Sequence, residues 1–237
     1  MTTSELKRLL IPVRLRERKA RYGNRLQDGG YVLLPSEISR AQVVYSHGVG
    51  KLESEIAFDI EMAEMGKIVC MFDGTIDRPY VAHPNFRFIR ENIHSRNIWR
   101  FVEYFRHDDM CDLTAQIDIE GCEYEALGNC DERFFGVFSQ ISLELHDLHA
   151  PTAQMAKTLS RLNEFYHIFH IVANNWEIAK LREPLIEGLP NVIEISLLRK
   201  DRLSYSPEVE PLGSPQPPLD VPNNPRLPFL NINWWQA

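Results

Sequence analysis

A group of acidic residues directly follows a short apolar run in the middle of the chain. Residues 113–127 read LTAQIDIEGCEYEAL, with carboxylates at Asp118, Glu120, Glu123 and Glu125. A carboxylate in such a position can act as a general base, hold a divalent cation or cap a helix. Because an unpaired buried charge is costly, stability alone does not explain Asp118, which comes directly after an apolar residue. We therefore expect Asp118 to be functional and the three glutamates to be solvated or helix-capping acids.

Polar residues also end the other apolar runs of the chain. They are Ser46, His47, Gly48, Asp73, Glu144, His146, Asn174 and Asn175. In open α/β sheets ligands bind outside the carboxyl ends of the strands, so these residues should face one crevice. His146 is a candidate base because imidazole titrates near neutral pH, whereas we interpret His149 as a surface loop residue. Asp118, Glu144 and His146 could instead hold Mg²⁺ or Mn²⁺, which accept oxygen ligands and one imidazole.

The elements that would position these residues alternate between strands and helices. Apolar runs predict strands within 41–50, 67–74, 85–92, 113–121, 138–146, 167–175 and 191–199. Helical spacing of apolar residues predicts helices within 52–66, 122–129 and 152–166. This alternation predicts an α/β, Rossmann-like doubly wound fold. Its seven-stranded sheet should be mostly parallel, with an antiparallel edge strand and helices on both faces.

Length and charge exclude some classes of protein. The chain has 237 residues, 44% of them hydrophobic, and a net charge of −7. Such a chain shows no basic face for nucleic acid, and no apolar run approaches the 18 residues of a membrane span. None of the four cysteines forms a C-x-x-C pair. We expect free thiols and a reducing, cytoplasmic location.

The two ends of the chain differ from the middle. Residues 1–22 contain the run KRLLIPVRLRERKAR, which predicts a basic lead-in helix, and 23–204 should form the main domain. Residues 205–237 hold eight prolines between Pro207 and Pro228 and end in NINWWQA. Such a tail should be extended, and its apolar residues favour packing on this subunit or on a neighbour in a homodimer. We expect truncation after Ser204 to leave the fold intact.

The glycine turn after the first strand favours a nucleotide-containing cofactor. SHGVGK is a fragment of the G-x-G-x-x-G pattern, and Asp73 is placed to accept hydrogen bonds from ribose hydroxyls. NAD(P) and S-adenosylmethionine both fit this arrangement. Glu53 and Glu55 open the next predicted helix, where they would repel a pyrophosphate and suit the ammonium and sulfonium charges of S-adenosylmethionine.

Eight segments in one order resemble those of the FkbM-type and related class I S-adenosylmethionine-dependent methyltransferases. They run from about Gly23 to Arg199 and read DGGYVLL, VVYSHGVGKLESEIAFDIEMAEMG, MFDGTID, NFRFIREN, QIDIEGCEYEAL, ISLELH, HIVANN and LPNVIEISLL. The chain departs from the family at Gln116, where Lys is frequent, in DGT, where DHT is usual, and before the double Asn of HIVANN. Ser46 also replaces an acid that is common in the wider superfamily. The resemblance implies cofactor contacts from Tyr45, Ser46, His47, Gly48, Gly50, Glu55, Asp73 and Thr75.

The resemblance implies methyl transfer from the sulfonium to a hydroxyl of a sugar or another small molecule, within the domain 23–204. Asp118 and His146 would be the catalytic residues, and Asp28, Asn174 and Asn175 would contact the acceptor. Two alternatives stay open. One is an NAD(P)-dependent oxidoreductase on a similar sheet, and the other is a relative that binds the cofactor without turnover.

Overall fold

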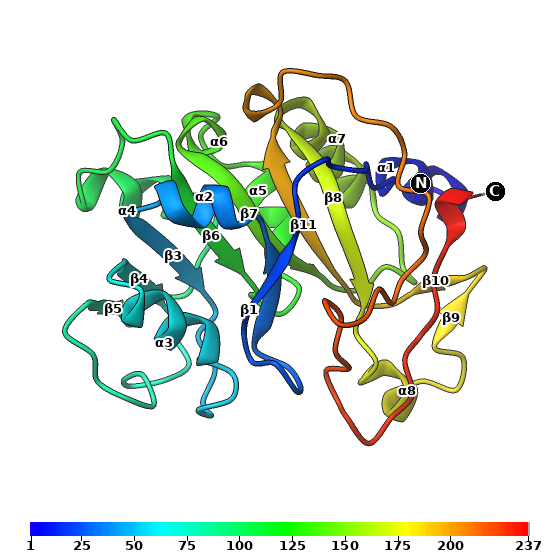
Figure 1. The fold of residues 1–237 in the computed structure, drawn as a ribbon, viewed down its shortest axis with the longest axis horizontal. Coiled ribbons are helices and arrows are strands. Elements are labelled where there is room, and N and C mark those ends of the chain that lie inside the picture. Colours follow the sequence, from blue (N-terminus) through cyan, green and yellow to red (C-terminus); the bar gives the residue numbers. More distant parts are fainter. Residues whose placement is uncertain (237) are drawn as a thin grey trace.

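A seven-stranded sheet forms the centre of the computed structural model, which describes residues 1–236 (Figure 1). The strands of this sheet, in chain order, are β3 (Val43–His47), β4 (Ile68–Phe72), β5 (Phe86–Ile89), β6 (Leu113–Ile117), β7 (Phe138–Leu145), β8 (Tyr166–Ala173) and β11 (Ile193–Arg199). Two hairpins lie outside it: β1 (Ala20–Gly23) with β2 (Gly30–Leu33), and β9 (Leu185–Ile186) with β10 (Leu189–Pro190). The helices are α1 (Thr3–Leu9), α2 (Pro35–Arg40), α3 (Ala57–Glu64), α4 (Ile98–Tyr104), α5 (Glu123–Gly128), α6 (Arg133–Val137), α7 (Ala153–Phe165) and α8 (Glu177–Lys180).

The order of the strands is β5-β4-β3-β6-β7-β11-β8. The five strands from β5 to β7 are parallel, whereas β11 is antiparallel to both β7 and β8. The predicted α/β fold with a mostly parallel seven-stranded sheet is therefore confirmed, but the antiparallel strand is not the edge strand. The reversed strand is β11, which lies one place in from the edge strand β8.

Different elements cover the two faces of the sheet. On one face α1, α4, α5, α6 and α7 pack over the main hydrophobic core. On the other face α2, α3 and the β1–β2 hairpin pack over a smaller core that includes Tyr31, Phe58 and Met62. The hairpin meets an unusually polar part of the sheet. Tyr31 accepts a hydrogen bond from Gln116 Nε2 at 3.0 Å, and Leu34 N donates to Gln140 Oε1 at 3.0 Å.

The N-terminal helix is much shorter than the lead-in helix expected over 1–22. Helix α1 begins with a capping box between Thr2 and Glu5 and ends at Leu9. Pro12 stops it, because proline cannot donate to the helical ladder and disfavours helix in the residue before it. The following segment is extended, and Val13 N donates to Ile168 O of β8 at 2.7 Å.

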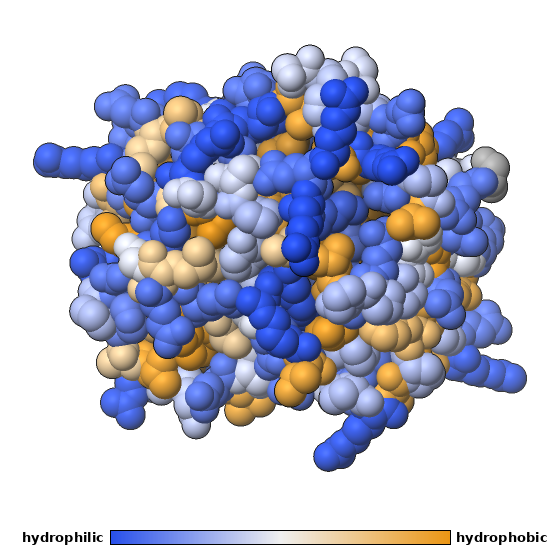
Figure 2. Space-filling view, viewed as in Figure 1, coloured by the Kyte–Doolittle hydropathy of each residue, from blue (hydrophilic) through white to orange (hydrophobic). Residues whose placement is uncertain are grey.

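The proline-rich tail packs on its own subunit along an extended course. Leu230, Ile232 and Trp235 are at most 8% exposed and belong to the main core. Figure 2, viewed from the same side as Figure 1, shows mostly hydrophilic side chains on that face of the molecule, with apolar side chains in small separate groups. The tail thus packs as part of the folded domain, and this burial argues against the expectation that truncation after Ser204 leaves the fold intact. Among residues 1–236 no helix is both long and apolar enough to cross a membrane.

Candidate functional site

The chain changes direction across the sheet between β3 and β6. Strands β4 and β5 extend to one side of β3, and β6 and β7 extend to the other. In open α/β sheets ligands bind at such a switch point, outside the carboxyl ends of the strands, and we call this edge of the sheet the crevice. Gly48 follows β3 there with φ +82°, and a Cβ on it would lie 1.6 Å from Asp118 O. Asp118 N donates to His47 O at 2.8 Å, so the glycine turn and the acidic segment are in direct backbone contact.

We expect Gly48→Ala to destabilise the fold. The loss should clearly exceed the cost of placing an alanine in a left-handed backbone, because the added Cβ would also clash with Asp118 O. Gly66→Ala is the matched control, because Gly66 also has φ +82° but nothing lies within 4 Å of its added Cβ. The control should lose about 1–2 kcal/mol of unfolding free energy, and Gly48→Ala at least about 2 kcal/mol more. Urea unfolding of both variants measures the difference. Equal losses would show that the contact with Asp118 is not tight.

Asp73 ties the glycine turn to the end of β4. Its Oδ2 accepts from Val49 N at 3.1 Å, and its Oδ1 accepts from the amide and the hydroxyl of Thr75, both at 2.7 Å. Burial alone would raise the pKa of Asp73, but hydrogen bonds from Thr75, Val49 and Gly50 hold it below its usual value. The carboxylate is therefore ionised at neutral pH. Glu55 closes the same loop, since its Oε2 accepts from Lys51 N at 2.5 Å and Leu52 N at 2.9 Å.

The three residues before the glycine turn have buried side chains. Tyr45 packs among core aromatic rings and its hydroxyl pairs with His107 Nδ1 at 2.9 Å, whereas Ser46 Oγ donates to Gln116 Oε1 at 3.0 Å. The ring of His47 stacks on Phe72, neither of its nitrogens has a hydrogen-bond partner, and burial lowers its pKa to about 3. The side chains of Tyr45, Ser46 and His47 are thus buried in the interior and do not reach the surface.

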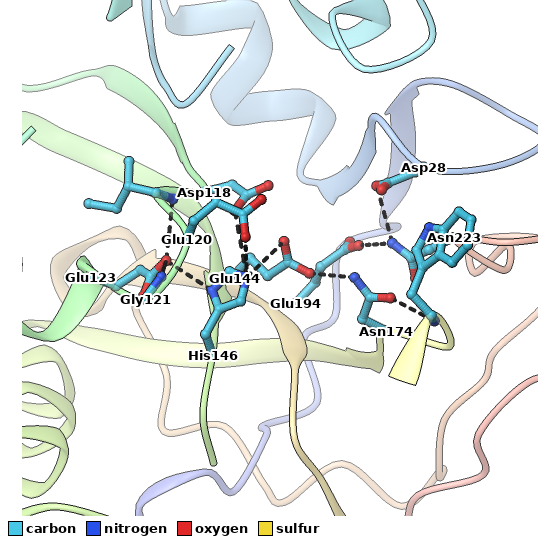
Figure 3. Close-up of polar contacts among 12 residues, drawn as sticks. Asp28, Asp118, Glu120, Gly121, Glu123, Glu144, His146, Asn174, Glu194 and Asn223 are labelled. Carbon is cyan, nitrogen blue, oxygen red and sulfur yellow. Dashed lines mark hydrogen bonds and ion pairs between the residues drawn. The ribbon is translucent and has the colours of Figure 1, made fainter. Parts of the chain in front are cut away.

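His146 stands at the centre of the acidic group (Figure 3). Its Nε2 lies 4.0 Å from Asp118 Oδ1, 3.6 Å from Glu120 Oε2 and 3.8 Å from Glu144 Oε2. Glu120 is 87% exposed, whereas the side chains of His146 and Glu144 are 15% and 11% exposed. The structure therefore brings together all three residues predicted as metal ligands, Asp118, Glu144 and His146, and adds Glu120. One ligand atom each from Asp118, Glu120 and His146 lies within 4.8 Å of the others.

Glu123 is buried, so the interpretation of this residue as a solvated or capping acid is wrong. It is the first residue of α5 and its side chain is fully buried. Its Oε1 accepts from Ile119 N at 3.2 Å, from Gly121 N at 3.1 Å and from His146 Nδ1 at 3.0 Å. Glu125, two residues later, is exposed as expected and accepts from the backbone and hydroxyl of Ser95.

Hydrogen bonds at and beyond Glu144 involve Asn174 and Asp28, which the sequence predicts for this site, and Glu194 and Asn223, which it does not. Glu194 of β11 lies directly opposite Glu144 of β7 in the antiparallel register. Asn174 Nδ2 donates to Glu144 Oε1 at 2.6 Å, and Asn223 Nδ2 donates to Glu194 Oε1 at 2.7 Å and to Asp28 Oδ1 at 3.2 Å. Asp28 comes from the β1–β2 loop and Asn223 from the tail, so both segments complete the far end of the crevice (Figure 3).

Asn175 lies apart from its neighbour Asn174. It is fully buried, and its Nδ2 donates to three tail carbonyls, those of Asn224, Leu227 and Pro228, at 2.9–3.2 Å. Its Oδ1 accepts from Asn224 N at 2.8 Å. Of the three residues predicted to contact an acceptor, Asp28 and Asn174 thus face the crevice, whereas Asn175 holds the tail.

The acids of the crevice outnumber the cations that face them. Burial raises the pKa of Asp118 to about 6 and that of Glu194 to about 7. Burial, and next the charge of Asp118, raise the pKa of Glu144 well above its usual range. Burial lowers the pKa of His146, but the hydrogen bond and charge of Glu123 and the nearby acids raise it overall. Such a site favours bound protons or a bound cation.

A scan against protein-family models finds no match, and a search of curated proteins finds no similar sequence. The chain is similar to the solved structure of a putative SAM-dependent methyltransferase from Streptococcus mutans. That likeness has a TM-score of 0.44 and 12% sequence identity, and covers 69% of this chain and 46% of that one. It is also similar to the structure of WbdD, with a TM-score of 0.43 and 11% identity, over 77% of this chain and 42% of that one. The chain spans less than half the length of either structure.

Proposed function

We propose that the protein is an S-adenosylmethionine-dependent methyltransferase that methylates a hydroxyl of a sugar or another small molecule. One observation carries this proposal: the glycine turn after β3 and the Asp118–His146 group meet at the switch point, with Gly48 pressed against the Asp118 carbonyl. A donor bound at the turn and an acceptor bound at the acids would therefore share one crevice. The seven-stranded sheet with one reversed strand is also the fold that the resemblance implies.

The cofactor would lie over the ends of β3 and β4. Asp73 and Thr75 would contact the ribose, and Gly48 and Gly50 would allow the donor to approach the backbone closely. Glu55 would face the cationic part of the donor, while Tyr45, Ser46 and His47 would form the floor below it. Because Asp73 is ionised, it can accept hydrogen bonds from hydroxyl groups.

Methyl transfer to a hydroxyl is an in-line displacement at the donor's methyl carbon. The protein must align the two reactants and remove the proton of the acceptor hydroxyl. His146 Nε2 faces the crevice and can take that proton as a general base. Asp118 would orient the acceptor hydroxyl and stabilise the protonated ring, while Asn174 and Asp28 would contact more distant acceptor groups.

A divalent cation, Mg²⁺ or Mn²⁺, fits the same residues. Asp118 Oδ1 is shielded from solvent and has no hydrogen-bond partner, and three carboxylate oxygens lie within 4.0 Å of His146 Nε2. Carboxylates with one imidazole are a donor set for these ions. Asp118, Glu120, Glu144 and His146 would hold the ion, which when bound lowers the pKa of a coordinated hydroxyl.

The two alternatives make different predictions in binding and turnover. A thermal-shift comparison of S-adenosylhomocysteine with NAD⁺ and NADP⁺ tests the cofactor, and mass spectrometry of the purified protein detects a retained one. Stabilisation by the nicotinamide cofactors alone would overturn the methyltransferase proposal. Binding of S-adenosylhomocysteine with no methylated product from a broad panel of hydroxyl acceptors would favour the non-catalytic relative.

We expect Asp73→Ala to weaken S-adenosylhomocysteine binding by about 10- to 100-fold. Loss of a hydrogen bond to a charged group costs about 1.5–3 kcal/mol, and 1.4 kcal/mol corresponds to a factor of ten in affinity. Isothermal titration calorimetry measures the change. Asp77→Ala is the control, because Asp77 is an exposed acid of the same loop that pairs with Arg90. Unchanged affinity in Asp73→Ala would remove Asp73 from the cofactor site.

A further inference from the structure

We infer that Glu123 is a positioning residue, which holds His146 so that Nε2 can bind a divalent cation together with Asp118, Glu120 and Glu144. This inference rests on the metal-assisted form of the proposed function. Glu123 would not touch the ion, the cofactor or the acceptor. It would act through the ring of His146 and through the loop that carries Asp118 and Glu120.

The first support is the way in which one carboxylate oxygen joins loop and ring. Glu123 Oε1 accepts from Ile119 N and Gly121 N and also meets His146 Nδ1 at 3.0 Å. Glu120 (φ +54°) and Gly121 (φ +94°) both have left-handed backbones. Because this conformation is unfavourable for a residue with a side chain, the hydrogen bonds to Glu123 help to hold the loop in it. Any change in this carboxylate should therefore move the loop and the imidazole together.

The second support is the hydrogen-bonding role that Glu123 imposes on the ring. Glu123 Oε1 already accepts from two backbone amides, so it also acts as the acceptor toward His146 and Nδ1 of His146 is the donor. The neutral ring then carries its hydrogen on Nδ1, and the lone pair of Nε2 points to the acids. Tyr124 adds a second restraint, because its hydroxyl donates to His146 O at 2.6 Å. The first two residues of α5 thus hold both the ring and the backbone of His146.

The third support is the group of carboxylate oxygens that surrounds Nε2 of His146. Oxygens of Asp118, Glu120 and Glu144 lie 3.6–4.0 Å from it, and Asp118 Oδ1 has no hydrogen-bond partner. Ligand atoms of Asp118, Glu120 and His146 lie within 4.8 Å of one another, which leaves room for an ion between these three groups. In metal sites a ligating histidine almost always donates its other ring N–H to a carboxylate or carbonyl, and loss of that partner costs about 10–100-fold in metal affinity. Glu123 occupies the position of that partner.

Mn²⁺ is the probe for the test, because its electron paramagnetic resonance reports affinity and pulsed measurements detect a coordinated imidazole nitrogen. The wild type should bind Mn²⁺ with a nitrogen coupling that His146→Ala abolishes. Glu123→Met keeps the side-chain length but removes both acceptors, so it should lose the nitrogen coupling and about 10–100-fold in affinity. Glu123→Gln keeps an acceptor for Nδ1 and should retain the coupling.

Glu125→Gln is the matched control, because Glu125 lies on the same helix and binds Ser95 on the exposed side. It should leave both affinity and coupling unchanged.

Wild-type affinity and coupling in Glu123→Met, or no Mn²⁺ binding by the wild type, would overturn the inference. If Glu123→Met does not fold, nitrogen NMR of the wild type decides: a hydrogen-bonded Nδ1–H of His146 must be present, and its absence overturns the inference. These measurements need neither cofactor nor acceptor, so a failure of methyl transfer alone would overturn only the proposed function.

Discussion

Asp118→Asn should remove most of the methyl transfer activity and leave the fold intact. Asparagine keeps the volume of the side chain but cannot act as a base and is a poorer ligand for a hard cation. We expect the rate to fall by about 10²-fold or more, which is the usual scale for loss of general acid–base catalysis. Activity is measured with a panel of hydroxyl acceptors, and melting temperature is measured on the same preparation.

The direction in which Asp118→Asn changes the stability of the fold can also be predicted. Burial raises the pKa of Asp118 from 3.8 to about 6 in the folded protein. An acid with a raised folded-state pKa costs stability once it ionises, so this cost is absent below about pH 4 and complete above about pH 6. Removal of the charge should therefore leave the melting temperature at pH 8 unchanged or higher. A structural role for the carboxylate predicts the opposite change.

Asp109→Asn is a suitable control, because Asp109 is an exposed acid in the loop before β6. It should change neither rate nor melting temperature. Full activity in Asp118→Asn would exclude Asp118 from catalysis. Wild-type activity that withstands EDTA would exclude the metal-assisted form, and His146 would remain as the general base.

The sheet could be predicted because each strand is an apolar run that ends in polar residues. Strand β6, for example, is buried along its whole length and passes directly to Asp118. Parallel strands bring their carboxyl ends together, so the meeting of Asp118, Glu144 and His146 followed from strand geometry alone. The β1–β2 hairpin could not be predicted in this way, because its strands have four residues each and contain glycine, a weak signal for strand.

The contacts of individual polar residues could not be predicted in this way. Glu194 meets Glu144 only because β11 runs antiparallel to β7 in one register, and a shift of one residue would turn Glu194 to the other face. Glu123 stands among exposed acids in the sequence, and nothing in the sequence distinguishes it from Glu125. His170 lies in a strand, and its Nε2 meets Asp220 Oδ1, fifty positions later in the chain, at 2.6 Å. Such pairs depend on how the tail crosses the domain.

Removal of the tail, residues 205–237, is the second change for which we expect a large effect. A chain that ends at Ser204 should fail to unfold cooperatively near the temperature of the full protein. It would lose Leu230, Ile232 and Trp235 from the main core, where truncation of a single large side chain costs about 2–5 kcal/mol. It would also leave Asn175 and His170 buried without their tail partners, at about 1–3 kcal/mol each. These losses together reach the total stability of a typical domain, about 5–15 kcal/mol.

Circular dichroism melting and proton–nitrogen NMR of the truncated chain test this expectation. Asp220→Ala isolates one part of it, because Asp220 is fully buried and pairs with His170 while it also accepts from Gln216 N at 2.6 Å. Loss of the hydrogen-bond partner of a buried polar group costs about 1–3 kcal/mol, so this variant should melt clearly below the wild type but still cooperatively. Addition of a peptide of residues 205–237 should restore dispersed NMR signals to the truncated chain. A truncated chain that melts cooperatively within a few degrees of the full protein would show that the tail is dispensable, and that the crevice does not depend on Asn223 for its far wall.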